Sequence, residues 1–161
     1  MTRGQVPDAK AAAMHAVKQI LVPIDFSDVS RAALESARTL ADACGASLHL
    51  IHVLGDPLAP PDVLGREQQD ACVRLAALLD ERDRTTRGAT ASCVPGTPAA
   101  EIVRYAAEHT IDVIVMGTHA HGPSFRMAAG SIADAVLGLA PCAVLAVKAP
   151  HAVAAGDFDP E

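Results

Sequence analysis

An aspartate and a serine close the first apolar segment of the chain. The segment QILVPID covers residues 19–25, and Phe26 and Ser27 follow directly. A carboxylate in such an apolar context needs hydrogen-bond partners. Asp25 therefore either accepts hydrogen bonds from the amine or hydroxyl of a ligand, or caps the helix or loop that follows. From these residues alone, both interpretations of Asp25 stay open.

A second candidate site is the long segment GTHAHGPSFRMAAGS. It begins at Gly117, after another apolar segment, and ends with Gly130 and Ser131. Connections between a strand and a helix usually take about two to six residues, and longer ones are more often functional. Glycines let backbone amides approach a ligand, and a hydroxyl at a helix start adds a further donor. This segment therefore predicts an anion site.

Two other chemistries are disfavoured for the same segment. Gly117 and Gly122 have the spacing of a phosphate-binding P-loop, but Pro123 stands where that motif has its lysine. His119 and His121 are separated by one residue and have no paired carboxylate, which makes them a weak signal for a metal site. We therefore expect neither Walker-type ATPase chemistry nor a metal ion held by these histidines.

The composition narrows the possible partners. The 161 residues carry a net charge of -6, and 50% of them are apolar, which is typical of one compact soluble domain. Because 13 Lys and Arg stand against 19 Asp and Glu, with no Trp and only one Tyr, the chain lacks the basic stripe and the stacking platforms of nucleic-acid binders. We expect no nucleic-acid partner.

The cysteines and the N-terminal residues bear on localisation. The four cysteines form no Cys-x-x-Cys pair, so we interpret them as small apolar filling residues rather than zinc ligands or a redox dithiol. The N-terminal residues contain no apolar stretch of secretory length, and no segment approaches the roughly 18 apolar residues that cross a bilayer. We therefore expect a cytoplasmic protein without a membrane partner.

Short apolar segments alternate with helical patterns along the whole chain. Strands are expected at 19–25, 47–54, 90–94, 112–117 and 142–148, and helices at 28–44, about 63–87, 98–109 and 131–140. This alternation predicts a doubly wound α/β fold, with a five-stranded parallel sheet and helices on both faces. Ligands of such sheets bind beyond the carboxyl ends of the strands, where both candidate sites are expected.

The expected helices have recognisable ends. Ser27 and Thr97 are suited to be N-caps, and Gly45 is suited to end the first helix in the left-handed conformation. Ser131 and Asp134 have the spacing of a capping box at the start of the last helix.

The sequence resembles the universal stress protein family over about residues 17–148. Three stretches carry the resemblance: ILVPIDFSDVSRAALESARTLADACGASLHLIHV, GTPAAEIVRYAAEHTIDVIVMGTH and GSIADAVLGLAPCAVLAVK. The resemblance implies a small doubly wound domain with strand order 3-2-1-4-5, between an Ala-rich extension at 1–16 and a tail at 149–161. Such proteins are commonly homodimers, and one branch binds ATP through a motif G-x2-G-x9-G-[ST].

The motif maps onto the long segment with one departure. Gly117 and Gly130 match its first and third glycines and Ser131 its hydroxyl, whereas Ala120 stands at the second glycine. The resemblance further implies that Asp25 meets the adenosine end of ATP, and that Mg²⁺ offsets the phosphate charge. The implied ATP-binding residues are Pro23, Asp25, Val53, Met116, Gly117, Ala120, Gly130, Ser131 and Ile132.

The function that the resemblance implies is that of an ATP-binding regulatory protein of the stress response, not an enzyme. A homodimer is expected through the last strand, Cys142 to Lys148, because an apolar sheet edge with few charges favours pairing with a copy of itself. Two alternatives stay open. Ala120 favours a stress protein that binds no nucleotide and works only through protein contacts. The similarity to adenylyl-transferring folds leaves slow ATP hydrolysis or nucleotidyl transfer, although the chain lacks an HxGH-type signature.

Overall fold

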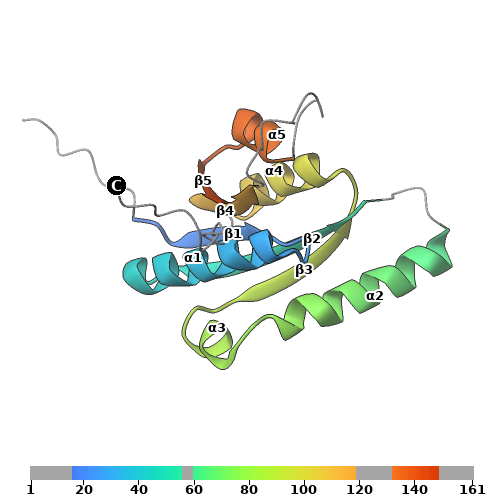
Figure 1. Cartoon of the computed structure of the whole chain (residues 1–161), viewed down its shortest axis with the longest axis horizontal. Helices are drawn as coiled ribbons and strands as arrows, with labels where there is room; N and C mark the ends of the chain where they lie inside the picture. Colours follow the sequence, from blue (N-terminus) through green and yellow to red (C-terminus); the bar gives the residue numbers. More distant parts are fainter. Residues whose placement is uncertain (1–15, 56–59, 119–131, 149–161) are drawn as a thin grey trace, which may run out of the picture.

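A computed structural model describes residues 16–55, 60–118 and 132–148 (Figure 1). The strands are β1 (Gln19–Pro23), β2 (Ser47–Leu54), β3 (Thr90–Pro95), β4 (Val113–Thr118) and β5 (Ala143–Lys148). The helices are α1 (Asp28–Cys44), α2 (Pro61–Ala77), α3 (Glu81–Thr85), α4 (Pro98–Glu108) and α5 (Ile132–Leu139). All strand pairs are parallel, and the strand order is β3-β2-β1-β4-β5. The predicted fold class and strand order are confirmed.

Helices cover both faces of the sheet (Figure 1). Because side chains alternate along a strand, Ile20 and Val22 point to one face and Leu21 to the other. The first face packs against α1 and α2, and the second against α4 and α5. Ile20, Leu21 and Val22 are fully buried, so β1 runs through the middle of the core.

The first helix begins and ends as the sequence predicts. The Ser27 hydroxyl accepts a hydrogen bond from the Ser30 amide at 3.2 Å, and Gly45 ends the helix with φ of 66°. Ala33 and Ala37 are fully buried, and their small side chains let the helix approach the sheet closely. The N-cap of α4 is also at the predicted residue, Thr97, but its side chain makes no capping hydrogen bond.

The prediction of a single long helix after residue 62 is wrong. The structure has two helices there, α2 and α3. Asp80 caps α3 by accepting a hydrogen bond from the Asp83 amide at 2.7 Å, and the Asp83 carboxylate accepts one from the Asp80 amide at 3.0 Å. This capping box starts a new helix. The apolar spacing hides the break, since Leu75 in α2 and Leu79 beyond it are both buried.

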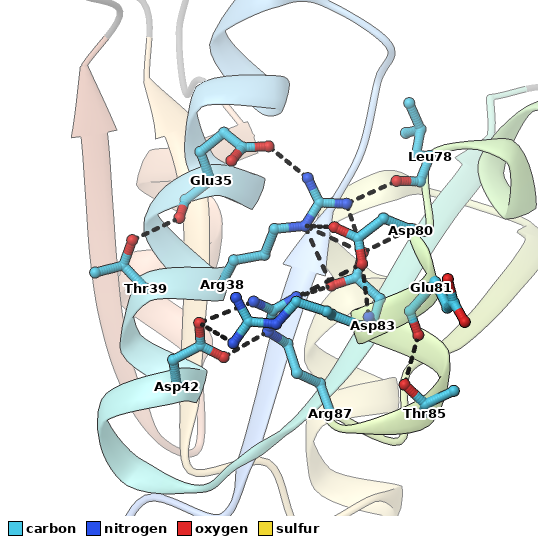
Figure 2. Close-up of polar contacts among 11 residues, drawn as sticks. Glu35, Arg38, Thr39, Asp42, Leu78, Asp80, Glu81, Asp83, Thr85 and Arg87 are labelled. Atoms are coloured by element: carbon cyan, nitrogen blue, oxygen red, sulfur yellow. Dashed lines mark hydrogen bonds and ion pairs between the residues drawn. The ribbon is translucent and has the colours of Figure 1, made fainter.

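An ion-pair network surrounds the start of α3 (Figure 2). Asp83 is fully buried, and its carboxylate accepts hydrogen bonds from Arg38 of α1 at 3.1 Å and from Arg87 at 2.6 Å. Arg87 is 5% exposed, and its other nitrogens donate to Asp42 of α1 at 2.9 Å. The network therefore joins α3 and the entry to β3 to α1.

The polar groups of this network satisfy one another. Burial raises the pKa of Asp83, but hydrogen bonds from Arg38, the Asp80 amide and Arg87 outweigh it and leave the pKa below its ordinary value. Among the described residues, every buried side-chain nitrogen and oxygen has a hydrogen-bond partner. The buried charge of Asp83 is thus fully compensated in the folded state.

Several predicted features lie at or beyond the limits of the described residues. The N-terminal residues 1–15, the tail at 149–161 and the Ser131 half of the expected capping box lie outside them. None of the described helices is both long enough and apolar enough to span a bilayer.

Candidate functional site

The strand order reverses between β1 and β4, which are neighbours in the sheet. The chain leaves β1 toward α1 on one face, and α5, the helix after β4, lies on the other face. This is the arrangement in which a crevice opens at the carboxyl ends of the strands. The candidate site is therefore the carboxyl edge of β1 and β4 and the adjacent end of β2.

Three apolar residues of the predicted pocket lie at this edge on the α4 and α5 face, and two of them, Pro23 and Val53, are partly exposed. Leu21 pairs with Ile114, and the same register continued places Pro23 beside Met116. Met116 is 5% exposed within the core on this face, and Val53 of β2 packs against that core. An apolar surface of this kind suits the flat face of a nucleobase or another planar group.

Asp25 lies just beyond the end of β1 and is exposed. Its Oδ1 atom accepts hydrogen bonds from the Ser27 amide at 2.9 Å and the Ser27 hydroxyl at 2.5 Å. Because Ser27 is the N-cap of α1, the local capping interpretation is confirmed: the carboxylate holds the turn that starts the helix. A ligand contact of Asp25 stays a prediction.

The protonation state of Asp25 limits what it can bind. Partial burial raises its pKa, but the hydrogen bonds from Ser27 and Ser30 outweigh burial, and the pKa lies below the ordinary aspartate value. Asp25 is therefore ionised at neutral pH, so it attracts hydroxyl and amine donors and repels phosphate groups.

Phe26 gives this turn an unusual backbone that the sequence did not predict. Its φ is 65°, a left-handed conformation that is uncommon for a residue other than glycine. The ring lies 4.7 Å from the ring of His52, and the Arg74 guanidinium lies 3.9 Å above its centre. The Nδ1 atom of His52 also forms a hydrogen bond with the Ile24 carbonyl oxygen at 2.7 Å. These contacts hold the strained turn in place. No sequence signal marks a phenylalanine for this conformation.

Gly117 is the second-to-last residue of β4, and the structure gives its missing side chain a packing role. A Cβ atom there would lie 2.6 Å from Cγ1 of Val29 and 2.7 Å from the Val29 carbonyl oxygen. The glycine therefore lets the first turn of α1 lie directly on β4. The sequence predicts ligand approach at this glycine and gives no sign of the packing requirement.

Five of the nine predicted site residues thus lie at one edge of the sheet. They are Pro23, Asp25, Val53, Met116 and Gly117. Ile132 is the first residue of α5 and is 48% exposed. Ala120, Gly130 and Ser131 lie outside the described residues.

Comparisons with known proteins agree with this architecture. A model of the universal stress protein family matches residues 16–148. A universal stress protein of Methanocaldococcus jannaschii is 31% identical over 144 residues, which cover 83% of each chain. The structure is similar to that of a universal stress protein from Lactobacillus plantarum, with 28% identity, a TM-score of 0.62, and coverage of 81% of this chain and 97% of that chain.

A third similar structure was solved with a ligand. It is a universal stress protein from Archaeoglobus fulgidus in complex with dAMP, with 20% identity, a TM-score of 0.59, and coverage of 83% of this chain and 99% of that chain. At this identity the similarity shows a shared fold.

Proposed function

Because the chain belongs to the universal stress protein family, we propose that it is a regulatory protein of the stress response that binds ATP with Mg²⁺ at the carboxyl ends of β1 and β4. The observation that carries the proposal is the ionised Asp25 at the edge of an apolar surface, at the point where the strand order reverses. The dAMP complex of a protein with the same fold supports an adenine nucleotide as the ligand.

Each part of the nucleotide has a suitable partner in this proposal. The apolar surface of Pro23, Val53 and Met116 accepts the adenine, and the Asp25 carboxylate accepts hydrogen bonds from the ribose hydroxyls. The residues between Gly117 and Ser131 and the N-terminus of α5 receive the phosphates. Mg²⁺ offsets the phosphate charge, which Asp25 would otherwise repel.

Calorimetric titration with Mg-ATP tests this proposal. We expect the wild-type protein to bind and Asp25→Ala to bind about tenfold more weakly, because a hydrogen bond to a charged group contributes about 1.5 kcal/mol. Asp28→Ala is the matched control, since Asp28 is also exposed and lies three residues further along the chain. It should leave the affinity unchanged.

A thermal melt of each variant shows whether the protein stays folded when the Asp25 contacts at the α1 N-cap are removed. If folded Asp25→Ala binds as tightly as the wild-type protein, the site is wrongly placed. If the wild-type protein does not bind at all, the alternative function is favoured, in which a nucleotide-free protein acts only through protein contacts. Ala120, at the second glycine of the motif, is the residue that favours this alternative.

A homodimer through β5 is the second part of the proposal. β5 is an edge strand, and its Leu145 side chain is 44% exposed. Ile132, Leu137 and Leu139 of the neighbouring α5 are exposed to similar or greater extents. An apolar, exposed sheet edge is a ready surface for pairing with a two-fold copy of itself.

Charge on this surface is expected to disrupt the dimer. At micromolar concentration, light scattering should give a dimeric mass for the wild-type protein and a mass shifted toward the monomer for Leu145→Lys. Val73→Lys is the control, because Val73 is 65% exposed on α2, far along the sheet from β5. A monomeric wild-type protein would contradict the dimer.

We also propose that ATP acts as a conformational signal rather than as a substrate for fast turnover. We propose further that the protein is cytoplasmic. Its four cysteines, which all carry free thiols, support this location.

A further inference from the structure

Two cysteines that are distant in the sequence meet between α2 and β3. Cys93 of β3 is 8% exposed, and Cys72 of α2 is half-buried against the same core. The Cys72 side chain lies close enough to Cys93 to raise the pKa of its thiol. One helical turn before Cys72, the Gln68 side chain donates a hydrogen bond to the Cys93 carbonyl at 3.0 Å. The helix is therefore held over the strand at the level of the two thiols.

The other two cysteines differ from this pair. Cys44 is exposed at the end of α1, and Cys142 precedes β5 at the opposite edge of the sheet from β3. Because β3 is an edge strand and α2 packs against it, a bond between Cys72 and Cys93 would tie the helix to that edge.

We propose that Cys72 and Cys93 form a reversible disulfide when the protein meets a hydroperoxide. This modification site goes beyond the proposed nucleotide binding and does not depend on it. Transient, redox-sensing disulfides are the kind expected in a reducing compartment. Gln68 and Cys72 are four residues apart on α2 and therefore lie on one face of it, so the hydrogen bond from Gln68 to the Cys93 carbonyl brings Cys72 to the same residue of β3.

The chemistry balances with hydrogen peroxide as the oxidant. The Cys72 thiolate attacks one peroxide oxygen, the O–O bond breaks, and a sulfenic acid and hydroxide form. The Cys93 sulfur then attacks the sulfur of that sulfenic acid. The S–S bond forms, the S–O bond breaks, and the hydroxyl leaves as water with the Cys93 proton. Overall, two thiols and one peroxide give one disulfide and two waters, and a dithiol reductant reverses the change.

The surroundings of the two thiols assign their order of reaction. Cys72 is the more exposed of the pair, so peroxide reaches it first. Burial, together with the hydrogen bond and the charge of Cys72, raises the pKa of Cys93 to about 12. Cys93 therefore stays protonated at neutral pH.

Peptide mapping after peroxide treatment tests the proposal. The native protein is treated with hydrogen peroxide, its remaining thiols are blocked with an alkylating reagent, and it is then digested. We expect the loss of two of the four thiols and a cross-linked peptide that joins Cys72 to Cys93. Dithiothreitol should restore both thiols. Cys142→Ser is the matched control, because Cys142 is also half-buried, and it should give the same cross-link.

A second variant, Cys93→Ala, tests which of the two cysteines reacts with peroxide first. Cys93→Ala lacks the attacking thiol, so Cys72 should accumulate as a sulfenic acid that dimedone labels. The proposal is overturned if the wild-type protein gives sulfinic acid at Cys72 with Cys93 still free. It is also overturned if the cross-links that form are intermolecular bonds through Cys44.

Discussion

Replacing Asp83 with alanine is expected to lower the free energy of unfolding by about 3–5 kcal/mol. The side chain is fully buried and compensates Arg38 and Arg87, which are both largely buried. Removal of one partner of a buried pair leaves uncompensated charge in a place that water reaches poorly. Arg87 keeps Asp42, but Arg38 loses its main acceptor. Urea denaturation at neutral pH measures the change.

The control for Asp83 is an ion pair on the surface. Arg104 is 53% exposed and pairs with Glu101 and Glu108 within α4. Arg104→Ala should change the free energy of unfolding by less than about 1 kcal/mol, because exposed pairs contribute little. Equal losses for the two variants would show that burial of Asp83 does not set the strength of its contacts.

Acid also distinguishes the wild-type protein from the Asp83 variant. The pKa of Asp83 is lowered in the folded state, so its contribution to stability is present above the unfolded value of about 3.9. That contribution to stability is lost as the pH falls through the pKa that Asp83 has in the folded protein. The wild-type protein should therefore lose more stability than Asp83→Ala on acidification below about pH 4.

Gly117→Ala is expected to cost about 1–3 kcal/mol of stability, because its methyl group has no room against α1. The atoms that it would meet are Cγ1 and the carbonyl oxygen of Val29, at 2.6 and 2.7 Å. Gly138→Ala is the control, since a Cβ atom at that helical position of α5 has nothing within 4 Å. That variant should gain up to about 1 kcal/mol from helix propensity. Thermal and urea unfolding measure both changes.

A rescue experiment separates the two contacts of Gly117. Val29→Ala in the Gly117→Ala background removes the Cγ1 contact but leaves the carbonyl oxygen at 2.7 Å, so the rescue should be partial. If Gly117→Ala is as stable as the wild-type protein, the packing role is wrong, and the interpretation of this glycine as a place of ligand approach would stand alone.

Local patterns were enough to predict the strands, the layers and the first helix. Largely apolar segments mark β1 and β4 because strands covered on both faces favour apolar residues. Ser27 and Gly45 mark the ends of α1 because their effects depend on adjacent backbone. The break between α2 and α3 was missed, since buried Leu75 and Leu79 continue the apolar spacing through it.

Contacts between distant residues could not be predicted in the same way. Arg38 and Asp83 are 45 residues apart, and only the packing of α1 beside α3 brings them together. The meeting of Cys72 and Cys93 depends on α2 lying over β3, so the absence of a Cys-x-x-Cys pair gave no hint of it.

The candidate site combines features that local sequence predicts with contacts between distant residues that it does not predict. The position of Asp25 at the end of the first apolar segment follows from the sequence, whereas the left-handed turn at Phe26 depends on His52 and Arg74 from other elements. The family motif marks Gly117, but the reason that a side chain does not fit there lies in Val29 of α1.

Amide NMR signals recorded during a titration with Mg-ATP test most directly whether an adenine nucleotide binds at the carboxyl edge of β1 and β4. We expect shifts at Asp25, Val53 and Met116. We expect none at Gly88 and Thr90, which lie at the opposite end of the strands. No shifts at saturating nucleotide, or shifts confined to Gly88 and Thr90, would contradict binding at this edge.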